Sequence, residues 1–113
     1  MRLAIWALAA LAASTATHQR VYGGTQTGTI TDFIVRDSDG LIYLQLSGTP
    51  TGRPTCAAGT PYWIIPNETT DTGKRLYSAL LGARMAGRSV IIVGKNTCTR
   101  LSTGEDIEAV NVQ

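Results

Sequence analysis

The sequence holds few of the side chains that usually carry catalysis. Its 113 residues include one histidine, His18, and two cysteines, and only 16% of them are charged. A hydroxyl or thiol nucleophile needs a base held beside it, and His18 lies next to a segment that we expect to be cleaved off. No glycine-rich phosphate loop and no dinucleotide-binding fingerprint is found. We therefore expect a protein that is not an enzyme and carries no cofactor.

Basic charge is also scarce. The formal net charge is +2, and the lysines and arginines form no polybasic run. Nucleic-acid-binding domains usually concentrate such charge on one face, so we expect no nucleic-acid partner. The only basis for a nucleic-acid partner would be a row of arginines that face outward, made of Arg36, Arg53, Arg88 and Arg100.

The acidic side chains lie mostly in predicted turns. Glu105 and Asp106 would form a calcium site if they joined Asp37 or Asp39, but no spacing matches a known calcium-binding loop. We therefore expect solvated turn acids and no metal.

The apolar run at the N-terminus is too short to cross a bilayer. It covers Leu3 to Ala13, whereas a spanning helix needs about 20 apolar residues. Arg2 before it and the small residues Ser14 to Ala16 after it are typical of a secretory signal peptide. A membrane anchor is the alternative. We predict a signal peptide over residues 1–16, a single domain over 17–113, and a secreted or periplasmic protein without an anchor after cleavage.

The two cysteines, Cys56 and Cys98, predict a disulfide, because an even pair in an exported chain is most simply a structural bridge. A redox pair usually has two residues between the cysteines, and a zinc site needs more ligands. The loop that the bridge closes is long, so it would stabilise a small domain substantially.

The stretch from Thr69 to Gly87 predicts one helix. Its apolar side chains share one helical face, which would pack on a core; they are Leu76, Tyr77, Leu80, Leu81 and Met85. Threonines and Asp71 supply N-caps, and Gly87 is suited to the left-handed conformation that ends a helix.

Five apolar or alternating segments predict strands. They are Thr27 to Val35, Leu41 to Ser47, Tyr62 to Ile65, Val90 to Val93, and Ile107 to Val112. Interrupted alternation near Asp32 to Ile34 suggests a bulge in the first strand, and Asp39-Gly40 suggests a hairpin turn.

The predicted order is strand, strand, strand, helix, strand, strand. It is typical of a mainly β fold with one α-helix, an OB-fold-like five-stranded Greek-key barrel. Another small β-barrel, or an α+β sheet with the helix on one face, is the alternative.

Aromatic side chains are few, at 6% of the sequence, so a small core needs most of them. We expect Phe33 and Trp63 in the core. Tyr43 and Tyr62 are the better candidates for exposed contacts with a sugar or a base.

Several stretches resemble the B subunits of the subtilase cytotoxin and typhoid toxin type, a group of small exported bacterial proteins. They are Thr27-Gly28-Thr29-Ile30, the Cys56 region followed by Tyr62-Trp63, the helix from Leu76 to Ala86, and Gly87 to Ile91. The resemblance implies an OB-fold, a ring-shaped homopentamer, and binding of glycans on host glycoproteins. A serine that contacts sialic acid in those toxins is matched here by Thr27.

Two hypotheses follow from these patterns. The first is a non-catalytic toxin B-subunit-like protein that binds cell-surface glycans and delivers a toxin A-type partner. Its ring would pair the first strand of one protomer with the last strand of the next. The second is a monomeric periplasmic or secreted OB-domain with a structural, inhibitory or protein-binding role.

Overall fold

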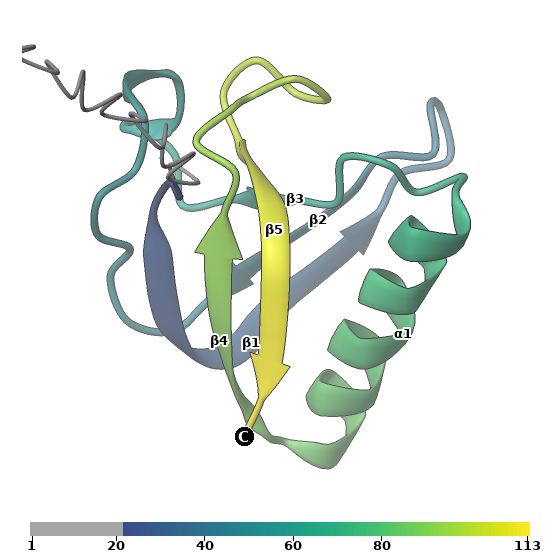
Figure 1. Ribbon diagram of the computed structural model, residues 1–113. Coiled ribbons are helices and arrows are strands. Elements are labelled where there is room, and N and C mark those ends of the chain that lie inside the picture. The colour runs from purple at the N-terminus through teal and green to yellow at the C-terminus, as the bar shows by residue number, and fades with distance from the viewer. Residues whose placement is uncertain (1–21) are drawn as a thin grey trace, which may run out of the picture.

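A computed structural model describes residues 22–113 as a five-stranded barrel with one long helix along its side (Figure 1). The predicted signal peptide, its cleavage site and His18 lie outside the described residues. Within residues 22–113, no helix combines the length and the apolar character that crossing a bilayer requires.

The strands form a closed barrel. They are β1 (Thr25–Val35), β2 (Ile42–Leu46), β3 (Trp63–Ile64), β4 (Ser89–Gly94) and β5 (Glu105–Val112). Their order around the barrel is β1-β2-β3-β5-β4, and β1 closes it by pairing with β4. Among these strands of residues 22–113, the β3–β5 pair is parallel and the other pairs are antiparallel. This confirms the predicted OB-fold-like barrel over the α+β alternative.

Strand β1 closes the barrel because it is long enough to pair with two neighbours. Its first half, Thr25 to Thr29, pairs with β4, and its second half pairs with β2. The register shifts between Ile30 and Asp32, so Thr31 is the extra residue of a bulge. The bulge lies directly before Asp32 to Ile34, the stretch where the sequence alternation breaks. A bulge bends and twists a strand, which lets one strand serve two parts of the barrel.

The helix α1 (Asp71–Ala86) begins and ends where the sequence predicts. The Thr70 side chain accepts a hydrogen bond from the Gly73 amide at 3.1 Å, and this caps the first turn. Gly87 has φ 64°, the left-handed conformation in which its amide donates back to the last turn. A 3-10 turn, η1 (Thr55–Ala57), interrupts the long β2–β3 loop.

The apolar face predicted for α1 is partly wrong. Leu80 and Ala83 are buried, and Leu76 and Tyr77 pack against the core. Leu81, however, is 37% exposed and Met85 80% exposed. The helix is turned so that its inner stripe runs through Leu76, Leu80 and Ala83. This orientation leaves Leu81 and Met85 of the predicted apolar face exposed to solvent.

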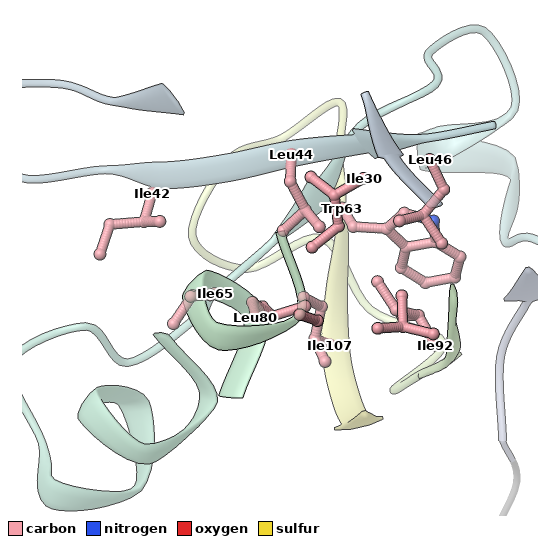
Figure 2. Packing of buried hydrophobic residues seen from close by; sticks show 11 residues of the cluster. Ile30, Ile42, Leu44, Leu46, Trp63, Ile65, Leu80, Ile92 and Ile107 are labelled. Carbon is pink, nitrogen blue, oxygen red and sulfur yellow. The ribbon is translucent and has the colours of Figure 1, made fainter. Parts of the chain in front are cut away.

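The core lies between α1 and the inner face of the barrel. In Figure 2, Leu80 of α1 points toward Ile107 of β5. The core residues come from every strand and the helix; they are Ile30, Ile42, Leu44, Leu46, Trp63, Ile65, Leu80, Ala83, Val90, Ile92 and Ile107. Trp63 is fully buried as predicted, whereas Phe33 is half-buried at the margin, with its ring 5.6 Å from that of Tyr77.

Glu105 is fully buried, contrary to the expectation of a solvated turn acid. Its carboxylate accepts hydrogen bonds from the Gly24 amide at 2.9 and 3.2 Å and from the Asn96 amide at 3.1 Å. The Arg53 Nε lies 3.9 Å from its Oε1. A side chain at Gly94 would collide with the carboxylate. Glu105 therefore connects the start of β1, the β2–β3 loop and the β4–β5 loop to the barrel.

Arg53 completes this buried cluster. Its side chain is 6% exposed, and its guanidinium carbon lies 4.3 Å from the centroid of the Trp63 ring. Its two terminal nitrogens donate to the carbonyls of Thr60 and Tyr62. Burial lowers the pKa of Arg53, and the Glu105 carboxylate opposes that shift. Through these contacts the guanidinium packs the β2–β3 loop against Trp63.

Asp106 is the second acid that is buried instead of solvated. Its carboxylate accepts hydrogen bonds from the hydroxyls of Thr97 and Thr99, at 2.7 and 2.6 Å, and from the Thr99 amide at 2.9 Å. These bonds stabilise the β4–β5 loop. Both residues belong to β5, which therefore starts two residues earlier than predicted.

The predicted disulfide is present. It joins Cys56, within η1, to Cys98 of the β4–β5 loop across 42 residues of sequence. It ties two long loops that the Glu105 cluster already brings together. The bridge is consistent with an oxidising extracellular or periplasmic environment.

Removing the bridge should lower stability without changing the fold. We expect the Cys56→Ala/Cys98→Ala double variant to lose about 4 kcal/mol of unfolding free energy, because the denatured chain regains the freedom of a long loop. Urea unfolding at pH 7 measures the loss, and wild-type protein reduced with dithiothreitol should reproduce it. An unchanged midpoint in both would contradict this role.

Neutralising Glu105 should be more costly than neutralising an exposed acid. Glu105→Gln places an amide NH₂ among donors and leaves Arg53 without its counter-charge, so we expect a loss of about 3 kcal/mol. Asp37→Asn, in the exposed β1–β2 turn, is the control and should change stability little. A loss of similar size in the two variants, measured by urea unfolding, would contradict the role of the buried carboxylate.

Candidate functional site

The candidate site is the outer face of β1, β2 and β3. Residues opposite each other on paired strands point to the same face. One row faces inward and contains Phe33, Leu44 and Trp63. The next row faces outward and contains Ile34, Tyr43 and Ile64. This outward surface is also where OB-folds commonly bind ligands.

Two of the predicted site residues meet on this face. The rings of Tyr43 and Tyr62 lie edge to face, with their centroids 5.1 Å apart and their planes at 87°. Both side chains are half-buried. The pair is held by backbone pairing, because Tyr43 is opposite Ile64 and Tyr62 directly precedes β3. The result is a partly exposed aromatic surface in a fixed position.

The β4–β5 loop forms one border of this face. Ile64 points outward yet is fully buried, and a side chain at Gly104 would collide with it. The loop therefore packs directly on β3. The loop leaves the neighbouring Tyr43–Tyr62 pair partly exposed. The disulfide and Asp106 stabilise this loop, so the border of the site is fixed.

Paired charges form a second border. Arg36 donates to Asp39 within the β1–β2 turn at 2.6 and 2.8 Å. Arg100 donates to Glu68 at 2.6 and 3.0 Å and to the Asp39 carbonyl at 2.8 Å. The hydrogen bond from Arg100 lowers the pKa of Glu68, and that from Arg36 lowers the pKa of Asp39. These pairs connect the β1–β2 turn, the segment before α1 and the β4–β5 loop.

The β1 bulge adds polar groups to the same face. Asp32 is opposite Gln45, which is two residues from Tyr43 on the same side of β2. The Thr31 hydroxyl donates to the Gln45 carbonyl at 3.4 Å and to the Asp32 carboxylate at 3.5 Å. The sequence analysis did not single out Asp32 or Gln45 as site residues. The alternation of β2 places Gln45 beside Tyr43, but only the bulge register brings Asp32 next to Gln45.

Thr27 lies away from this cluster. It is exposed on the first half of β1, opposite Ile91 of β4. It is seven positions before Ile34, which pairs with Tyr43, a span of about 23 Å along the chain. The structure therefore brings Tyr43 and Tyr62 together but does not add Thr27 to them.

A shallow pocket of about 480 Å³ opens on the β2–β3 loop. It is lined by Thr49, Pro50, Arg53, Ala58, Gly59, Thr60 and Pro61. Its one charged residue, Arg53, already binds two carbonyls and faces Glu105. The lining otherwise offers small side chains and two threonine hydroxyls, which give little basis for choosing a ligand.

The acidic residues do not form a metal centre in the part of the chain that the structure describes. No group of three or more His, Cys, Asp or Glu side chains suited to a metal occurs there. Glu105 and Asp106 accept hydrogen bonds from backbone amides and threonine hydroxyls. These carboxylate oxygens are therefore already engaged, which argues against the alternative of a calcium site at this pair.

The Arg100–Glu68 pair predicts a pH-dependent contribution to stability. Because folding lowers the Glu68 pKa, the contribution is present above the unfolded pKa of about 4.3 and is lost as the pH falls through the folded value. We expect Glu68→Gln to cost about 1 kcal/mol at pH 7 and progressively less below pH 4. Urea unfolding across this range, with Asp37→Asn as the control, tests it. A constant difference down to about pH 2 would contradict the ion pair as the cause.

Comparison with known proteins does not identify this face. No protein-family model matches the chain, no curated protein matches it, and no solved structure matches it. The resemblance to toxin B subunits therefore stays an expectation, and the outer face of β1, β2 and β3 is the remaining guide to function.

Proposed function

We propose that this protein is an exported, non-catalytic binding module that recognises glycans through the outer face of β1, β2 and β3. The observation that carries the proposal is the Tyr43–Tyr62 pair, half-buried and in edge-to-face contact on that face. A small domain gains more by burying such rings in its core. Their partial exposure at the OB-fold binding surface is what a ligand would use.

The chemistry of the pair suits sugars. The apolar faces of pyranose rings pack on aromatic side chains, while each tyrosine hydroxyl can donate and accept hydrogen bonds. The surrounding loops are fixed by the disulfide and by the Arg100–Glu68 pair. A preformed site of this kind loses little conformational freedom on binding.

Export is supported by one prediction and one observation. The signal peptide predicted over residues 1–16 would direct the chain out of the cytoplasm. The Cys56–Cys98 bridge fits the oxidising compartment that export would reach. A cell-surface or glycoprotein glycan is then an accessible ligand.

The monomeric alternative also has an observation in its favour. A ring joined through the first strand would need a free edge on β1. The first half of β1 pairs with β4 on one side, and on the other side Thr25 exchanges hydrogen bonds with Thr51 while Thr29 accepts from the Ser47 amide. Ring assembly through this edge would have to replace those bonds, whereas a monomer keeps them.

Native mass separates these two assemblies. Light scattering of the oxidised mature protein over a dilution series should give a single mass at all concentrations. A stable mass near that of a pentamer supports the toxin-like delivery ring with an A-type partner. A monomer supports the lone OB-domain and removes the ring from the proposal.

Glycan binding should depend on both rings. We expect Tyr43→Ala and Tyr62→Ala each to weaken binding about tenfold, the loss that roughly 1.4 kcal/mol of stacking corresponds to. A glycan array followed by calorimetry on the best ligand measures it. Tyr22→Ala is the matched control, because Tyr22 is exposed and precedes β1. Urea unfolding checks that the variants remain folded.

Two results would contradict the proposal. One is the absence of any bound glycan at millimolar concentration. The other is a bound glycan whose affinity is unchanged by both tyrosine substitutions.

A further inference from the structure

We propose that the ligand contacted by this face is a neutral sugar with vicinal hydroxyls, held by the Asp32 carboxylate and the Gln45 amide beside Tyr43 and Tyr62. This inference rests on the proposed glycan-binding function and deepens it. It names the ligand class and adds two residues to the site.

The strand register places these four side chains on one surface. Asp32 is directly opposite Gln45, and Ile34 is opposite Tyr43. Leu44 is opposite Trp63, so the next step of the antiparallel register brings Tyr62 toward Gln45. Gln45 therefore lies between Asp32 on one side and Tyr62 on the other. Neighbouring strands are about 4.8 Å apart, which gives a row about 10 Å wide.

The bulge leaves the Asp32 carboxylate available. Asp32 is exposed, and within residues 22–113 its one hydrogen bond is the 3.5 Å contact with the Thr31 hydroxyl. The Gln45 side chain is half-buried and makes no hydrogen bond within that range, although its backbone carbonyl accepts from Thr31. Bulges often redirect a side chain beside a functional site. Here the bulge sets a carboxylate next to an amide that has no side-chain hydrogen bond within the described residues 22–113.

These two groups match a pair of adjacent hydroxyls. A carboxylate accepts hydrogen bonds at both oxygens, and a glutamine amide both donates and accepts. Hydrogen bonds to an ionised acceptor are stronger than neutral ones. A pyranose that packs on the tyrosines would therefore direct two neighbouring hydroxyls at Asp32 and Gln45.

The charges around the face disfavour an acidic sugar. Each nearby arginine is engaged within the chain: Arg36 by Asp39, Arg53 by Glu105 and Arg100 by Glu68. A sugar carboxylate would face Asp32, a like charge, and none of these three guanidinium groups is free to offset the repulsion. A neutral sugar meets no such cost.

The position of Thr27 agrees with this ligand class. Thr27 is the residue that the toxin resemblance assigns to sialic acid. It is five positions before Asp32 on β1, about 16 Å of strand. One sugar ring on the tyrosine pair therefore does not reach it.

The test uses the oxidised mature protein and two sets of probes, methyl glycosides of neutral hexoses and N-acetylneuraminic acid. We expect neutral hexosides to shift the NMR signals of Asp32, Gln45 and Tyr43. Asp32→Asn and Gln45→Ala should each weaken binding at least fivefold. Asp71→Asn removes the same charge from the exposed first turn of α1 and should leave binding unchanged, as should Thr27→Ala.

The outcomes separate this inference from the proposed function. If N-acetylneuraminic acid binds through the tyrosines and Asp32→Asn strengthens it, the neutral-sugar inference is overturned while glycan binding stands. If neutral hexosides bind but Asp32→Asn and Gln45→Ala have no effect, the assignment of these residues is overturned. If neither set binds at millimolar concentration, both the inference and the proposed function fail.

Discussion

The buried carboxylate of Glu105 is the constraint on which the rest of the structure depends. Three segments that are distant in sequence meet around it: the Gly24 amide before β1, the Asn96 amide after β4, and Arg53 of the β2–β3 loop. A buried charge is tolerated only when it is paired and hydrogen-bonded. In the closed barrel these three segments are therefore held together around Glu105, and the guanidinium of Arg53 lies over the ring of Trp63.

The outer surface of the barrel follows from this arrangement. The inner face of the sheet and α1 bury most of the apolar side chains, and the loop ends are fixed by Asp106 and the disulfide. Tyr43 and Tyr62 remain half-exposed on the outer face and do not enter the core. Binding through this face would therefore leave the core and its buried ion pair undisturbed.

The outer face also suggests how specificity for a ligand would arise. An aromatic pair offers contact area with little geometric discrimination, whereas a carboxylate beside an amide discriminates by hydroxyl position and by charge. The two kinds of group lie next to each other because the β1 bulge shifts the register at Ile30. A single extra residue, Thr31, thus sets which side chains accompany the tyrosines.

The sequence by itself determined the order of strands and helix, the ends of α1, the disulfide and the burial of Trp63, because these depend on local periodicity, capping residues and a single cysteine pair. Only the tertiary structure decided the rotation of α1, which exposes Met85, and the burial of Glu105. It also decided the meeting of Tyr43 with Tyr62 and of Asp32 with Gln45. The local sequence pattern shows which face of a helix or strand is apolar. The strand register and the closure of the loops decide which groups distant in sequence come into contact.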